Sequence, residues 1–179
     1  MTPKMHTYTG LQIDPLKICE TDINIKDIAH ALSLLCRGGG HLNTFYSVAQ
    51  HSINCAKEAM SRGYRHDIVL GCLLHDASEA YLCDIIRPVK QYLDLYLQIE
   101  TQIMNVIFQK YNLYLLFDDL QIIKRIDDEM LQHELYELMN NQTKPVDTLK
   151  IQPDLKEKDY REVEKNFLEL FHQLEYEKS

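Results

Sequence analysis

Apolar residues recur at steps of three and four along most of this chain, the spacing that gives an α-helix one buried face. A first helical stretch begins at Asn24, and Gly38-Gly39-Gly40 supply a strong stop signal after it. Ser47 suits the N-cap of the second helix. The later stripes predict helices over residues 47–60, 67–81, 89–111, 119–139 and 155–177.

Two other segments lack a helical stripe. Residues 7–14 alternate weakly around Gly10, which predicts a short N-terminal β-hairpin, and residues 141–153 are expected to form a loop. The pattern as a whole predicts an all-α fold of five to seven helices. We expect a single domain over residues 1–179, with its core at about 24–140 and the last helix docked on that core.

Length, charge and cysteines narrow the class of protein. A chain of 179 residues with 45% apolar content can bury a sizeable core. The net charge of −8 argues against stable nucleic-acid binding, which needs a basic face, but a single nucleotide is compatible with it. Five cysteines without a C-x-x-C pair indicate free thiols. Neither a signal peptide nor a run of about 18 apolar residues is present, so we expect a cytoplasmic protein without a membrane segment.

Four ionisable side chains lie inside apolar helical stretches: His51, the adjacent pair His75 and Asp76, and the distant Asp127. Burying such groups costs free energy unless they are paired or bind a metal. Imidazole and carboxylate together suit divalent ions such as zinc, cobalt and manganese. The order H…HD…D therefore predicts a metal site, with water in the remaining positions and hydrolysis as its chemistry.

Each of these residues alone has an ordinary interpretation. His51 could be a hydrogen-bonded core histidine, and Asp127, beside Asp128, could be a solvated or capping carboxylate. Together they are better explained by a metal, because the surrounding helices hold too few Arg and Lys residues to pair all four.

Neighbouring residues could serve a phosphate or a sugar. Glu79, four residues after His75, could accept a proton from the attacking water, or be an ordinary helix-face glutamate. Asp84 could accept a hydrogen bond from a sugar hydroxyl, or cap the next turn. Arg37 suits a phosphate, and the three glycines after it let backbone approach a ligand. Three more side chains could contact phosphate or simply face solvent: His41, Arg87 and Lys90.

These motifs resemble the HD-domain metal-dependent phosphohydrolases. More narrowly, they resemble the compact branch of 5′-deoxyribonucleotidases and small phage hydrolases that includes deoxyadenosine triphosphatases. The likeness runs from about Thr7 to Leu138 and rests on the segments YSVAQHS, LLHDASEAYL, D-x-x-R-P-x-K and K-R-x-D-D. It implies a helical HD-domain bundle, a homo-oligomer, and a divalent cation such as Zn, Co or Mn, with Mg as a further candidate ion.

The resemblance also assigns roles by position. It implies that the metal ligands are His51, His75, Asp76 and Asp127. Glu79 would orient or deprotonate the attacking water, Asp84 would lie near the sugar 3′ position, and Arg37 would contact phosphate. The chain departs from the pattern after that arginine. Where the nucleotidases place a bulky aromatic residue it has Gly38-Gly39-Gly40, so no adenine selectivity is predicted.

The sequence thus predicts a metal-dependent phosphohydrolase acting on a small (deoxy)nucleotide. It does not choose between a 5′-nucleotidase, which releases phosphate from a monophosphate, and a dATPase-like triphosphohydrolase, which releases triphosphate. Two alternatives stay open. One is a phosphodiesterase of a cyclic or linear oligonucleotide, and the other is a non-catalytic metal or nucleotide sensor on the same scaffold.

Overall fold

The computed structural model describes residues 4–139, 143–146 and 148–178, most of which are helical. Within these ranges, the helices of nine residues or more are α1 (Ile25–Leu34), α2 (Val48–Ser61), α3 (His66–Leu74), α6 (Asp94–Lys110), α7 (Phe117–Leu138) and α8 (Tyr160–Lys178). Two shorter helices are single turns, α4 (Glu79–Leu82) and α5 (Arg87–Lys90). The predicted all-α class is confirmed.

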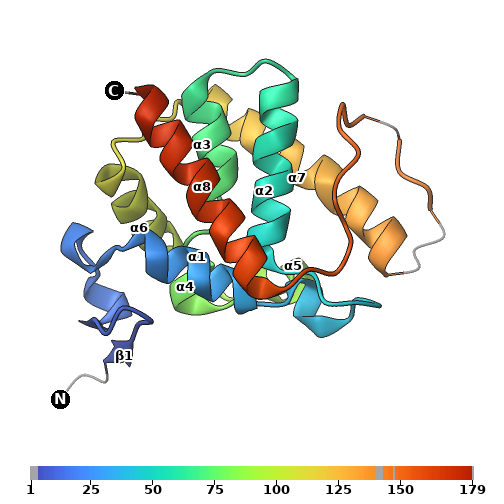
Figure 1. The fold of residues 1–179 in the computed structure, drawn as a ribbon. Coiled ribbons are helices and arrows are strands. Elements are labelled where there is room, and N and C mark those ends of the chain that lie inside the picture. Colours follow the sequence, from blue (N-terminus) through green and yellow to red (C-terminus); the bar gives the residue numbers. More distant parts are fainter. Residues whose placement is uncertain (1–3, 140–142, 147, 179) are drawn as a thin grey trace.

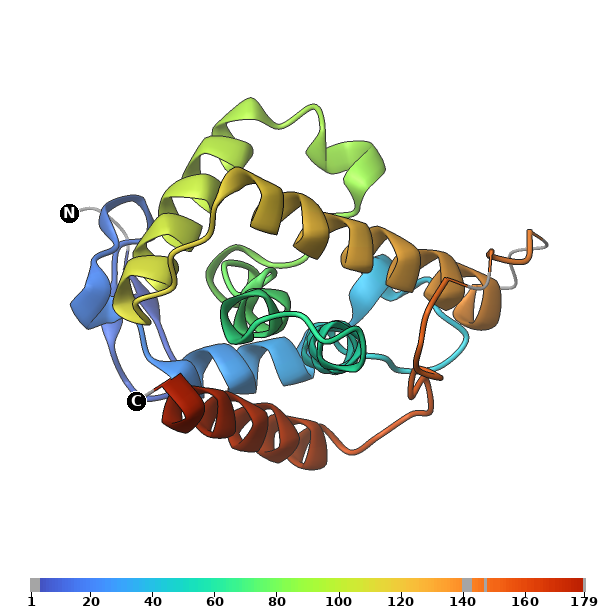
Figure 2. The same cartoon turned by 90° about the horizontal axis from the view of Figure 1, so that it is seen from above.

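Helices α2 and α3 run side by side at the centre of the molecule (Figure 1). In Figure 2 both are seen end-on, with α1 and α8 on one side of the pair and α6 and α7 on the other. The buried apolar residues form one cluster around them. The C-terminal helix contributes Val163, Phe167, Phe171 and Leu174, as its stripe indicated, and it packs on α1, α2 and α3.

The ends of the first elements follow local sequence signals. Asn24 accepts a hydrogen bond from Lys26 N–H at 3.0 Å and caps α1, while Ser47 accepts from Gln50 N–H at 3.2 Å and caps α2. The predicted hairpin is present, with β1 (Met5–His6) antiparallel to β2 (Gln12–Ile13). It begins two residues earlier than expected, because Met5 pairs with Ile13 across the turn that contains Gly10.

The helix predicted over residues 67–81 is interrupted. It ends at Leu74, and the hydrogen bonds of the following turn span three residues, as from Ala77 N–H to Leu74 C=O and from Glu79 N–H to Asp76 C=O. This tighter winding brings residues three apart onto one line, so Glu79 lies above Asp76 and not above His75. No Pro or Gly announces the break in the sequence.

The helix predicted over residues 89–111 is also divided, into α5 and α6, with residues 91–93 between them. The apolar positions at this point are exposed: Tyr92 and Leu95 retain 80% and 69% of their accessible surface. Burial therefore does not hold the junction in a helix, and Leu93 has non-helical dihedral angles. Residues 143–146 and 148–153 form no helix or strand, as expected for the loop, whereas 141, 142 and 147 lie outside the described residues.

A polar stripe on α2 fastens the segment that precedes α8. Gln50, Asn54 and Glu58 lie four residues apart on this helix and are all buried. Gln50 Nε2 donates to the carbonyl oxygens of Asp154 and Lys156 at 2.9 and 2.8 Å, and Asn54 Nδ2 donates to Asp154 C=O at 3.0 Å. These bonds satisfy buried polar groups on both partners, so the segment is fixed by hydrogen bonds where it has no regular structure.

Glu58 makes the strongest of these attachments. Its carboxylate accepts Lys150 N–H at 2.8 Å and Ile151 N–H at 2.9 Å, and it pairs with Arg62 Nε at 2.6 Å. Burial alone would raise the pKa of Glu58, but the Lys150 N–H and the Arg62 guanidinium lower it below its ordinary value. The ionised form is therefore the one that the fold prefers.

All five cysteines are free thiols, as the absence of a paired motif indicated. Among the helices of the described residues, none combines the length and the apolar content needed to cross a membrane.

We expect Glu58→Gln to lower the free energy of unfolding by about 1–3 kcal/mol at neutral pH, because the amide loses a charge-assisted acceptor. Since the folded-state pKa of Glu58 is depressed, its contribution is present above the ordinary carboxyl pKa of about 4.3 and is lost as pH falls through the folded value. Urea unfolding at pH 7 and in acid measures this difference. Exposed Glu169→Gln is the control, and an equal loss in both variants would contradict the assignment.

Candidate metal centre and adjoining cavity

Four side chains that can bind a metal meet between α2, α3 and α7. His51 lies in the first turns of α2, and Asp127 lies in the middle of α7. His75 and Asp76 follow the last residue of α3, on the tight turn before α4. The structure therefore brings together the four residues that the sequence pattern singled out.

Their nitrogen and oxygen atoms are close enough to share one ion. His51 Nε2 lies 3.2 Å from Asp127 Oδ1 and 3.3 Å from His75 Nε2. His75 Nε2 lies 3.3 Å from Asp76 Oδ2 and 3.7 Å from Asp127 Oδ1. His51 Nε2 and Asp76 Oδ2 are 4.0 Å apart. Ligands about 2.0–2.2 Å from one ion are separated by about 2.8–4.4 Å, so these distances fit a shared cation.

The second ring nitrogen of each histidine already has a partner. His75 Nδ1 donates to the carbonyl oxygen of Cys72 at 2.7 Å, and His51 Nδ1 lies 2.5 Å from Glu134 Oε1. Such a bond fixes the tautomer and leaves the Nε2 lone pair for a ligand. Both rings are therefore oriented to bind through Nε2 at the same centre.

The charges of the cluster favour a cation at its middle. Burial would lower the pKa of His75, but the carboxylates of Asp76 and Asp127 outweigh it and raise the pKa to about 9. For Asp127 the effects are reversed: burial would raise its pKa, while His51 and His75 hold it well below its ordinary value. The carboxylates therefore favour positive charge at this place, and a divalent cation can supply it.

Cys55 is a fifth group beside the same atoms. The potential ligand atoms of His51, Cys55 and His75 all lie within 4.8 Å of one another, so these three residues alone could form a metal-binding group. Burial raises the pKa of the Cys55 thiol well above its ordinary value, whereas His75 and Arg37 lower the pKa of Asp76 against the effect of burial. The ionised carboxylates are therefore stronger candidates than the neutral thiol for the principal ligands.

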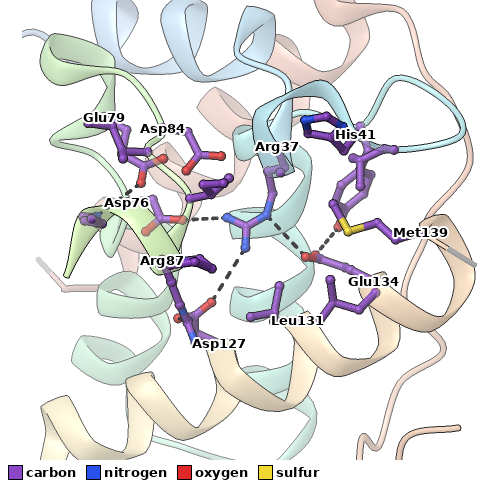
Figure 3. Close-up of a pocket in the computed structure, with 18 residues that line it drawn as sticks. Arg37, His41, Asp76, Glu79, Asp84, Arg87, Asp127, Leu131, Glu134 and Met139 are labelled. Atoms are coloured by element: carbon purple, nitrogen blue, oxygen red, sulfur yellow. Dashed lines mark hydrogen bonds and ion pairs between the residues drawn. The ribbon is translucent and has the colours of Figure 1, made fainter. Parts of the chain in front are cut away.

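Arg37 lies directly over the carboxylates (Figure 3). Its guanidinium is 3.0 Å from Asp76 Oδ2, 3.3 Å from Glu134 Oε2 and 4.0 Å from Asp127 Oδ1. Two backbone bonds of 3.0 Å, from Arg37 N–H to Tyr46 C=O and from Val48 N–H to Leu35 C=O, close the loop that carries it. Because these bonds fix its backbone, Arg37 is a fixed positive charge at this position.

The glycine after Arg37 makes room for an apolar wall. Gly38 has a φ of 62°, and a Cβ at this position would lie 2.6 Å from Met139 Cε. A larger residue would therefore displace the Met139 side chain, which reaches this place from the end of α7.

The cluster opens onto a cavity of about 570 Å³, drawn in Figure 3. One part of its wall is charged and holds Arg37, Asp76, Glu79, Asp84, Arg87, Lys90, Asp127 and Glu134. Another part is apolar and holds Leu42, Ile85, Ile86, Leu131, Leu135 and Met139. A site of this volume with both kinds of wall suits a small ligand that has one charged and one apolar end.

Glu79 faces the cavity from the start of α4 and is only 4% exposed. Among the described residues its Oε2 has no hydrogen-bond partner, while Lys90 Nζ lies 3.7 Å from Oε1. Burial, followed by the negative charges of Asp76 and Asp84, raises the pKa of Glu79 to about 10. A buried carboxyl without a full set of partners is available to a ligand or a water.

The remaining predicted contacts also line the cavity. Asp84 lies near Glu79, with its pKa raised mainly by burial. Arg87 is half exposed and pairs with Asp127 and Asp128, and exposed His41 lies at the rim. Lys90 Nζ forms an ion pair with Glu100 Oε1 at 2.5 Å, so its charge is partly neutralised within the protein.

The sequence pattern did not single out Glu134, a buried carboxylate that contacts three other groups. It accepts from Tyr46 Oη at 2.9 Å in addition to its contacts with His51 and Arg37. Its signal was its spacing, because Glu134 lies seven residues after Asp127 and hence two turns along the same face of α7.

Comparison with known proteins supplies relatives but no function. No known protein-family profile matches the sequence. The chain is 43% identical over 107 residues to the uncharacterized protein YfdR of Escherichia coli (strain K12), which covers 60% of this chain and 57% of that protein. It is 40% identical over 87 residues to the uncharacterized protein RCAP_rcc00048 of Rhodobacter capsulatus, covering 46% and 44%. The chain thus spans about half the length of these curated relatives.

We expect Glu134→Gln to lower the pKa of His51 in chelator-treated protein. Burial and the charge of Arg37 lower this pKa, whereas Glu134 and Asp127 raise it, so the net upward shift depends partly on the carboxylate that the variant lacks. The fall in pKa can be followed by NMR titration of the imidazole. Exposed Glu137→Gln, on the same helix, should leave the pKa unchanged. An unchanged pKa in Glu134→Gln would mean that the His51–Glu134 contact is absent in solution.

Proposed function

We propose that this protein is a divalent-metal-dependent phosphohydrolase of the HD-domain type, acting on a nucleotide. The observation that carries the proposal is the convergence of His51, His75, Asp76 and Asp127 at the charged end of a cavity. Two imidazoles with fixed tautomers and two ionised carboxylates suit Zn, Co or Mn, and Mg is a further candidate.

A divalent ion at this centre supplies Lewis-acid polarisation of a phosphoryl oxygen and makes an attached water more acidic. Arg37 supports the same chemistry, because its guanidinium lies within 3.0–4.0 Å of both aspartates and faces the cavity. A phosphate that entered here would be neutralised and oriented by Arg37 through paired hydrogen bonds. Arg87 and Lys90 add positive charge to the same wall.

Glu79 is the candidate proton acceptor. Burial raises the pKa of Glu79 and the negative charge of Asp76 raises it further, so a cation bound to Asp76 would bring the pKa of Glu79 back toward its ordinary value. Its carboxylate can then take a proton from the water that attacks phosphorus. The free Oε2 and the buried position suit this role.

The rest of the cavity fits the nucleoside. Asp84 supplies an acceptor for a sugar hydroxyl beside the phosphate end. The apolar wall, which includes Leu131, Leu135 and Met139, would lie against the base. Because Gly38 has no side chain, Met139 occupies the space beside it and would make the contact with the base. The Met139 side chain is flexible, so the wall itself specifies no particular base.

The test is a product assay with full-length protein, nucleoside mono- and triphosphates of both sugar types, and added Mn, Co or Zn. Metal-dependent release of nucleoside with phosphate indicates a 5′-nucleotidase, and release with triphosphate indicates a triphosphohydrolase. Cleavage of cyclic or linear oligonucleotides only would favour the phosphodiesterase. Tight metal binding without turnover of any substrate would favour the sensor.

Two neighbouring aspartates on α7 give a matched pair of variants. Asp127→Asn should lose metal binding and turnover together, because Asp127 Oδ1 faces both histidines. Asp128→Asn should keep both, since Asp128 pairs outward with Lys124 and Arg87. Metal content by atomic emission and the product assay measure the two effects. Equal behaviour of the two variants would exclude Asp127 as a ligand.

Glu79→Gln should separate binding from catalysis. The variant is expected to retain metal and to lose turnover by about 10²–10⁴-fold, the usual contribution of general base catalysis. Metal content and kcat, measured on the same sample, test this. If Glu79→Gln kept full turnover, another group would have to accept the proton.

A further inference from the structure

One buried group at the metal centre has no part in the mechanism above. Cys55 lies one helical turn after His51 on α2, and its side chain is 1% exposed. Its Sγ is 3.5 Å from His51 Nε2, and Sγ lies within 4.8 Å of the nearest imidazole nitrogens of His51 and His75. It is therefore beside the two atoms that are oriented toward the cation.

We infer that Cys55 is a fifth ligand, which binds the cation through its thiolate from the side opposite the cavity. The inference rests on the proposed metal centre and adds to it the class of metal that this protein prefers. Cys55 is not one of the four residues, His51, His75, Asp76 and Asp127, on which the proposed function depends.

The distance between Cys55 Sγ and His51 Nε2 permits both atoms to bind one ion. Metal–sulfur bonds of about 2.3 Å and metal–nitrogen bonds of about 2.0–2.1 Å place the two ligand atoms about 3.1–4.4 Å apart for angles between 90° and 180°. The 3.5 Å separation of Cys55 Sγ and His51 Nε2 lies within this range. Because His51 and Cys55 are one turn apart on one helix, this separation is set by the helix itself.

The hydrogen bonding of Cys55 also supports its role as a ligand. Among the described residues, the partner of Cys55 Sγ is His51 Nε2. A cation would bind to the lone pair of this same nitrogen. A bound cation therefore removes the partner of a buried thiol and stands next to it. Coordination gives the sulfur a new partner, and the thiol proton leaves to the buffer.

The position of Cys55 is also compatible with catalysis. Asp76 and Asp127 line the cavity, whereas His51 and Cys55 do not. A sulfur ligand on the closed side leaves the side facing Arg37 and Glu79 for water and substrate. Thiolate is a soft ligand that favours zinc and cobalt over manganese and magnesium, so Cys55 would select the metal without blocking the site.

The experiment is a cobalt(II) titration of chelator-stripped, reduced, full-length protein, followed by absorption spectroscopy under anaerobic conditions. The unmodified protein should show intense near-ultraviolet absorption from thiolate-to-cobalt charge transfer, together with weaker visible bands. Cys55→Ala and Cys55→Ser should lose the charge-transfer absorption, keep the visible bands and bind cobalt more weakly. In competition, both variants should shift from zinc toward manganese.

Cys72→Ala is the matched control, because Cys72 is also buried and its carbonyl oxygen accepts from His75. It should retain the charge-transfer absorption. Visible cobalt bands without charge transfer in the unmodified protein would overturn the role of Cys55 and leave the metal centre intact. Loss of charge transfer in Cys72→Ala but not in Cys55→Ala would mean that Cys72 supplies the sulfur ligand. That result would also overturn the role of Cys55. Failure to bind cobalt, zinc or manganese at all would overturn both proposals.

Discussion

The buried carboxylate of Glu134 is the contact on which the arrangement of the site depends. It touches His51 Nδ1, Arg37 Nε and Tyr46 Oη, three groups on the segment from Arg37 to His51, which is remote from Glu134 in the sequence. A buried charge is stable only when it is paired and hydrogen-bonded, and removing one partner of such a group typically costs about 3–5 kcal/mol. The same contact turns His51 Nε2 toward the centre and holds Arg37 over the cavity. The Glu134 carboxylate therefore both stabilises the fold and positions the side chains of the candidate site.

Helix α2 connects this contact to the rest of the molecule through two polar faces. His51 and Cys55 face the candidate metal centre, whereas Gln50, Asn54 and Glu58 bind the backbone of residues 150–156. Asn54 Nδ2 also donates to Tyr46 Oη at 2.9 Å, so the segment before α8 is linked through Tyr46 to Glu134. A helix with polar residues on two sides can remain buried because each side has its own fixed partners.

Periodicity predicted the positions of α1, α2 and α7 well, because each has a buried stripe that is visible in the sequence. The stripe of α8 was also visible, but this helix begins at Tyr160, later than the expected start at about residue 155. It failed where hydrogen bonding or exposure decided the outcome: at the tight turn after Leu74 and at exposed Tyr92. The four residues that meet at the candidate site could be singled out from the sequence, since ionisable residues in apolar segments are unusual. Glu134 could not be distinguished from the other glutamates of α7, because its role depends on Tyr46 and Arg37, which are brought to it only by the fold.

The close approach of α3 and α7 explains why the four side chains of the candidate site meet at this place. Gly71 lets α7 approach α3, since a Cβ there would lie 2.5 Å from Ile123 Cδ1. One turn further along each helix, His75 and Asp127 come within 3.7 Å. Asp127 then divides its oxygens: Oδ1 faces the histidines and Oδ2 pairs with Arg87. Burial would raise the pKa of Asp127, but His51 and His75 keep its carboxylate ionised, and Arg87 pairs with only one of its oxygens. This division leaves Oδ1 toward the histidines, where the cation of the proposed metal centre would lie.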